Sequence, residues 1–60
     1  MYAIINKNNQ YLTRRNLFDD YSFIDNNNFA YVWGNINEAE AVRNILIKHQ
    51  GITNLEIVTI

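Results

Sequence analysis

Apolar and polar positions divide this chain into several short segments and one longer segment with helical spacing. Across residues 35–51 apolar side chains recur every three or four positions. Asn35 and Glu38 have the spacing of an N-cap residue and its N3 partner, as do Asn37 and Glu40, and we favour Asn35. Gly51 suits the left-handed residue that ends a helix. The pattern therefore predicts one amphipathic helix over about residues 36–50.

Part of this helix is expected to face the protein interior. At about 100° per residue, the inward stripe consists of Ala39, Val42, Ile45, Leu46 and His49. Ile47 lies outside the stripe, so we expect its side chain on the solvent side of the helix. A lone exposed isoleucine is common in soluble proteins, but it also suits contact with a partner.

The hydrophobic pattern before the helix predicts a hairpin over residues 2–13. Residues 2–6 and 10–13 read as two short strands, and Lys7-Asn8-Asn9 separates them. Asparagine tolerates the positive φ angles of tight turns, so this tripeptide suits the reversal. Residues 14–28 keep neither a strand nor a helix period, and we expect a long connection with room for a turn of helix or a short strand.

Two further segments are predicted to be strands, at residues 29–33 and 55–60. Together the elements predict a single small α+β domain over residues 1–60. Its sheet has three to four strands, is mainly antiparallel, and carries the helix on one face. If the strands on either side of the helix lie parallel in one sheet, the crossover between them should be right-handed.

The size of the chain raises the question of how it is stabilised. At 60 residues it is near the lower limit for independent folding. It has no cysteine for a disulfide, and its single histidine, His49, cannot hold a zinc ion alone. A partner chain is the remaining means of stabilisation, which makes self-association a hypothesis.

Composition argues against several classes of function. The net charge of −1 lacks the basic excess of a typical nucleic-acid-binding protein. The longest apolar runs, residues 1–5 and 29–33, are far shorter than the roughly 20 residues that span a bilayer. Signal-peptide features are also missing, so we expect a cytoplasmic protein. No residues have catalytic or metal-ligand spacing, so we predict no enzymatic activity, cofactor or metal.

Aromatic residues favour a role in protein contacts. Four tyrosines, three phenylalanines and one tryptophan are more than one helix is expected to cover. Tyrosine and tryptophan are frequent anchors of protein interfaces, although a small core also needs large side chains. We expect Trp33 in the core. The leading hypothesis is a non-enzymatic protein-interaction module that contacts another protein, or a second copy as a homodimer, through Ile47, Tyr2 and Tyr31.

The alternative hypothesis is a small nucleic-acid-binding regulator. Arg14 and Arg15 would contact phosphates, and Tyr11 and Tyr21 would stack on bases. Two adjacent arginines are also common as solvated residues at the end of a strand. The overall charge favours the protein-interaction hypothesis.

Several short motifs carry a resemblance to known proteins. They are Met1-Tyr2-Ala3-Ile4, Tyr11-Leu12, Ala30 with Trp33, Asn35 with Glu38-Ala39, and Leu55-Glu56-Ile57-Val58. By these motifs the chain resembles a family of short proteins of similar length from phages and prophages of low-GC Gram-positive bacteria. The resemblance covers most of the chain outside residues 14–28. It implies an accessory protein of a mobile element in the host-cell cytoplasm, and it implies no catalytic residue.

Overall fold

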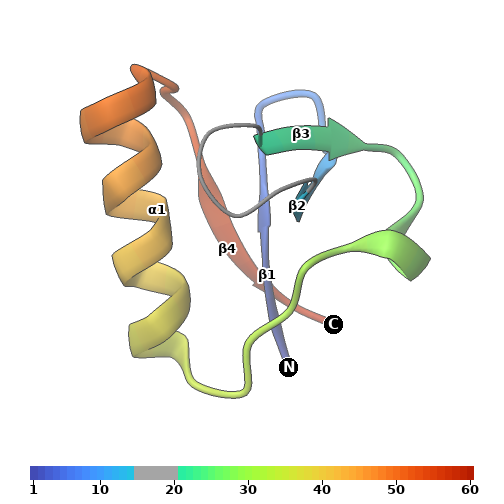
Figure 1. The fold of residues 1–60 in the computed structure, drawn as a ribbon. Helices are drawn as coiled ribbons and strands as arrows, with labels where there is room; N and C mark the ends of the chain where they lie inside the picture. Colours follow the sequence, from blue (N-terminus) through green and yellow to red (C-terminus); the bar gives the residue numbers. More distant parts are fainter. Residues whose placement is uncertain (15–20) are drawn as a thin grey trace.

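The computed structural model describes residues 1–14 and 21–60, which form a four-stranded sheet with one α-helix packed against it (Figure 1). The elements are β1 (Tyr2–Ile5), β2 (Tyr11–Arg14), β3 (Tyr21–Ile24), the short 3-10 helix η1 (Asn27–Phe29), α1 (Ile36–Gln50) and β4 (Glu56–Thr59). The strand order is β3-β2-β1-β4, and every neighbouring pair is antiparallel. The predicted α+β fold with a helix on one face is confirmed.

The helix α1 begins and ends at the predicted residues. The side-chain oxygen of Asn35 accepts a hydrogen bond of 2.8 Å from the backbone N–H of Asn37. At the other end Gly51 has a φ of 68° and donates its N–H to the carbonyl of Leu46. These two caps satisfy backbone groups that the helix leaves unpaired at its ends, so they fix its length.

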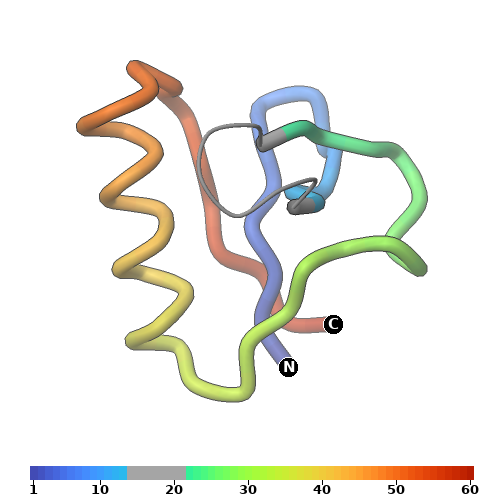
Figure 2. Tube along the Cα trace, in the orientation of Figure 1, coloured from blue at the N-terminus to red at the C-terminus, as the bar shows by residue number. Residues whose placement is uncertain are grey.

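The predicted strand over residues 29–33 is wrong. Phe29 ends η1, and Trp33 forms an isolated antiparallel bridge to Tyr2, with N–H···O distances of 2.8 and 2.9 Å. The N–H of Tyr31 instead donates to the carbonyl of Leu12 in β2, at 2.9 Å. Because its hydrogen bonds go to two different strands, the segment is an extended connection. Figure 2 shows it passing from η1 to the start of β1, after which the chain enters α1.

The third strand of the sheet comes from the stretch that was expected to be a long connection. β3 pairs with the whole of β2, from Tyr11 opposite Ile24 to Arg14 opposite Tyr21. The short strand allowed for within residues 14–28 is therefore present. Residues 15–20 lie outside the described part of the chain.

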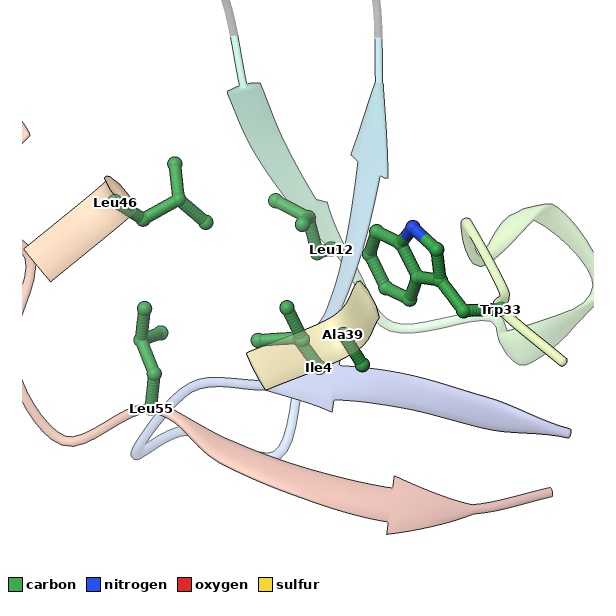
Figure 3. Close-up of a cluster of buried hydrophobic side chains, with 6 residues drawn as sticks. All are labelled: Ile4, Leu12, Trp33, Ala39, Leu46 and Leu55. Carbon is green, nitrogen blue, oxygen red and sulfur yellow. The ribbon is translucent and has the colours of Figure 1, made fainter. Parts of the chain in front are cut away.

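The core lies between α1 and one face of the sheet. Figure 3 shows its six buried side chains: Ile4, Leu12, Trp33, Ala39, Leu46 and Leu55. The expected core position of Trp33 is confirmed. Half-buried side chains surround this cluster: Tyr2, Phe23, Tyr31, Val42, Ile52 and Ile57.

The inward stripe of α1 is narrower than predicted. Ala39 and Leu46 are fully buried and Val42 is half buried, as expected. Ile45 is 50% exposed and His49 is exposed, so their predicted inward positions are wrong. Among the described elements, α1 packs mainly against β1 and β4, which cover a narrow strip of the helix. The last turn, which holds His49, is level with the loop before β4 (Figure 1).

We predict that Leu46→Ala unfolds the domain at room temperature. The change removes a fully buried side chain, which costs about 2–5 kcal/mol, and a domain of 60 residues has little stability to lose. Thermal unfolding followed by circular dichroism measures the effect. Ile45→Ala is the matched control and should unfold close to the wild-type temperature. A Leu46→Ala variant as stable as this control would contradict the assigned core.

Candidate interaction surface

The structure places the three predicted interface residues in different surroundings. Ile47 is 42% exposed on α1. Tyr2 and Tyr31 are half buried and pack against the core cluster. The ring of Tyr31 lies against that of Trp33, with centroids 4.6 Å apart and planes tilted by 54°. The two tyrosines therefore contribute to the core, and only part of each side chain is available to a partner.

Ile47 is not close to Tyr2. α1 ends at one end of the molecule, and β1 begins at the other end (Figure 1). Ile47 belongs to the last turns of α1, whereas Tyr2 is the first residue of β1. A single small contact patch cannot include both residues.

α1 carries a second exposed isoleucine on the same side as Ile47. Ile36 is 41% exposed, and it precedes Ile47 by eleven positions. At 3.6 residues per turn, this spacing places the two side chains within about 20° of each other around the helix axis. Glu40 and Arg43, both half buried, lie between them. We call Ile36, Glu40, Arg43 and Ile47 the helix flank.

Ile45 does not belong to the helix flank. Its side chain is exposed, but it projects about 160° away from Ile47 around the helix axis. Sequence reasoning found Ile47 from the helical period. It missed Ile36, although the eleven-residue spacing from Ile47 places the two side chains on one side of a helix.

The sheet face that turns away from α1 carries further apolar side chains. Ile4 points into the core, so its neighbours along β1 point to the opposite face. Strand pairing extends this outer face across the sheet, and its apolar members are Ala3, Ile5, Tyr11, Ile24 and Val58. Ala3 is fully buried and the others are half buried. α1 lies on the other side, where Figure 3 shows all six core side chains.

The four residues of the nucleic-acid hypothesis are only partly described. Arg14 and Tyr21 are register partners at one end of the β2–β3 ladder. Tyr11, which is half buried, pairs with Ile24 at the other end of the same ladder. Arg15 lies outside the described residues. The backbone thus brings two of the four positions side by side.

A groove of about 470 Å³ opens between the β1–β2 turn and the start of β4. It is lined by Ile5, Asn6, Lys7, Asn9, Asn54, Leu55 and Glu56. The Asn6 side-chain oxygen accepts hydrogen bonds from the backbone N–H groups of Asn8 and Gln10, at 2.9 and 3.0 Å. Asn9 has a φ of 60°, the left-handed conformation that the turn requires. At least two of the polar groups at this groove thus serve the turn itself.

No protein-family model matches the chain, and no curated protein or solved structure matches it either. The resemblance to phage and prophage proteins therefore stays a prediction. Within residues 1–14 and 21–60, no helix has the length and hydrophobicity needed to cross a bilayer.

We predict that Asn6→Ala destabilises the β1–β2 hairpin. The substitution removes the acceptor of two backbone N–H groups, and the loss of such bonds costs about 1 kcal/mol or more. Asn8→Ala is the matched control, because Asn8 is exposed and uses its backbone N–H in this network. Urea unfolding should show a lower midpoint for Asn6→Ala only. Equal midpoints for the two variants would contradict this role of Asn6.

Proposed function

We propose that this protein is a non-enzymatic protein-interaction module. The observation that carries the proposal is the exposure of Ile36 and Ile47 together on one side of α1, outside the core. Complete burial of a fully exposed isoleucine contributes roughly 1.5–3 kcal/mol, and the 41% and 42% exposure of Ile36 and Ile47 leaves under half of that for association at each position. The flank also offers Glu40 and Arg43, which lie between the two isoleucines, for polar contacts with a partner.

The biological setting is part of the same proposal. The motifs at both ends of the chain resemble those of phage and prophage proteins. On that basis we propose an accessory protein of a mobile element, acting in the cytoplasm of the host cell. The proposal includes no catalytic step, because the sequence lacks groups with catalytic spacing. The partner is another protein or a second copy of this chain.

The test compares the same substitution at two adjacent positions of α1. Ile47→Asp should leave the domain folded, because the side chain is 42% exposed. It should weaken self-association or partner binding, because it places a carboxylate on the helix flank. Leu46→Asp should abolish folding, because Leu46 is fully buried. Circular dichroism reports folding, and sedimentation velocity reports self-association.

Binding to another protein is measured by affinity capture from a host lysate with wild type and Ile47→Asp side by side. Loss of a captured protein in the Ile47→Asp sample alone supports the proposal. A wild-type protein that stays monomeric and captures nothing contradicts it. If Ile47→Asp unfolds the chain as fully as Leu46→Asp, Ile47 belongs to the core and the flank is not an interaction surface.

A nucleic-acid-binding regulator is the second candidate. The observation that favours it is the pairing of Arg14 with Tyr21 across β2 and β3. We expect such binding to weaken steeply as salt rises, since arginine contacts with phosphate release counterions. A double Arg14→Ala and Arg15→Ala variant should lose affinity for single-stranded DNA or RNA in a mobility-shift assay. Unchanged affinity, or no binding by wild type at low salt, would exclude this candidate.

A further inference from the structure

The outer edge of β4 has no neighbouring strand within residues 1–14 and 21–60. β4 is the last strand in the order β3-β2-β1-β4, so no strand of the described chain lies beside its outer edge. Sheet proteins protect such edges with short strands, charged side chains, proline, a β-bulge, or a covering helix or loop. β4 is short, at four residues, and carries one charged side chain, Glu56. Residues 56–59 include no proline, glycine or lysine. The register with β1 also runs without interruption from Thr59 opposite Tyr2 to Glu56 opposite Ile5, so there is no bulge.

Two hydrogen bonds establish which backbone groups of β4 point outward. Met1 and Ile60 exchange both of their bonds: N–H of Ile60 to the Met1 carbonyl at 2.8 Å, and the Met1 nitrogen to the Ile60 carbonyl at 3.2 Å. Hydrogen-bonded pairs alternate along an antiparallel ladder. The next such pair is therefore Ala3 with Val58. It follows that the N–H and C=O groups of Ile57 and Thr59 point away from β1.

The opposite edge of β1 gives an independent check. Tyr2 exchanges both of its backbone bonds with Trp33, at 2.8 and 2.9 Å. The backbone groups of Tyr2 therefore point away from β4. Its register partner Thr59 must also direct its backbone groups away from β1, toward the open edge.

We propose that the open edge of β4 binds the same edge of a second copy of this chain. The two strands run antiparallel, with the two-fold axis at Val58. Ile57 of each copy then lies opposite Thr59 of the other, and every outward N–H of these residues meets an outward C=O. This inference rests on the proposed function and names one partner and one surface for it.

The self-complementarity of β4 specifies the register. Centring the pairing on Val58 lets both Ile57 and Thr59 bond within the strands, so each copy donates two hydrogen bonds. If the two-fold axis lies at Ile57 or at Thr59 instead, only that one residue of β4 bonds to β4 of the other copy. In the Val58 register the two Glu56 side chains lie about four residues, or 13 Å, apart, so these like charges do not face each other.

A cysteine substitution tests this register directly. The chain has no cysteine, so Val58→Cys introduces one thiol per copy. The two Val58 positions form a non-hydrogen-bonded pair with Cα atoms about 4.5 Å apart, within disulfide reach. Mild oxidation should convert Val58→Cys to a covalent dimer. Glu56→Cys is the matched control on the same strand face, and its two thiols would lie about four residues, or 13 Å, apart.

A pair of proline substitutions tests the outward direction of the Thr59 backbone. Thr59→Pro removes an N–H that points away from β1, a position where edge strands tolerate proline. It should keep the circular dichroism spectrum of the fold and weaken self-association by about tenfold or more. Val58→Pro removes an N–H that faces Ala3, and it should unfold the domain. Sedimentation velocity over a range of concentrations measures the association.

Three outcomes would overturn the inference. They are a wild type that is monomeric at millimolar concentration, a folded Thr59→Pro variant that associates as tightly as wild type, and cross-linking of Glu56→Cys as fast as that of Val58→Cys. If Thr59→Pro does not fold, the cross-linking rates of Val58→Cys and Glu56→Cys still test the proposed pairing. Dimerisation lost in Ile47→Asp but kept in Thr59→Pro would overturn the β4 edge while supporting the proposed function.

Discussion

β1 is the strand on which the other elements assemble, because its backbone is hydrogen-bonded along both edges. β4 occupies one edge, and β2 and Trp33 share the other. The side chain of Ile4 in β1 is fully buried on the face that α1 covers. One strand thus joins the hairpin, the connection before the helix and the last strand. With six fully or nearly fully buried residues in the core cluster, each contact to β1 accounts for a large share of the stability.

The small size of the domain also explains why apolar side chains remain on its surface. A single helix resting on two strands buries Ala39 and Leu46, but it cannot cover the other apolar residues of the chain. Ile36 and Ile47 remain on the helix flank, and the outer sheet face keeps Val58 half exposed. The outward backbone groups of β4 have no strand partner within the described residues, because the four described strands do not close into a barrel. Association through such surfaces would add burial that one copy cannot provide.

The sequence predicts best where local chemistry determines the structure. Asn35 and Gly51 determine both ends of α1, because caps act through neighbouring backbone groups. The alternating aromatics of residues 29–33 suggested a strand, yet their hydrogen bonds go to β1 and β2 at separate points. β3 has four residues, too few to show a period. Helical spacing predicts which side of α1 faces the core. It does not predict how wide the buried stripe is, because that depends on β1 and β4 beneath the helix. Ile45 was therefore predicted to face inward but is 50% exposed.

The candidate surfaces also divide into features that local sequence predicts and features that depend on long-range contacts. The exposure of Ile47 could be predicted because it depends only on the helical period. The outer face and the open edge of β4 could not, because they depend on strand order and on the pairing of Met1 with Ile60. Both are long-range contacts, and no local pattern in residues 55–60 reveals which neighbour this strand takes.

Amide hydrogen exchange measured by NMR at two protein concentrations tests the central claim most directly. The N–H of Val58 faces β1 and should be protected at both concentrations. The N–H groups of Ile57 and Thr59 should exchange rapidly in dilute solution and become protected as the concentration rises. Rapid exchange of Ile57 and Thr59 at every concentration, with Val58 protected throughout, would contradict pairing through the edge of β4.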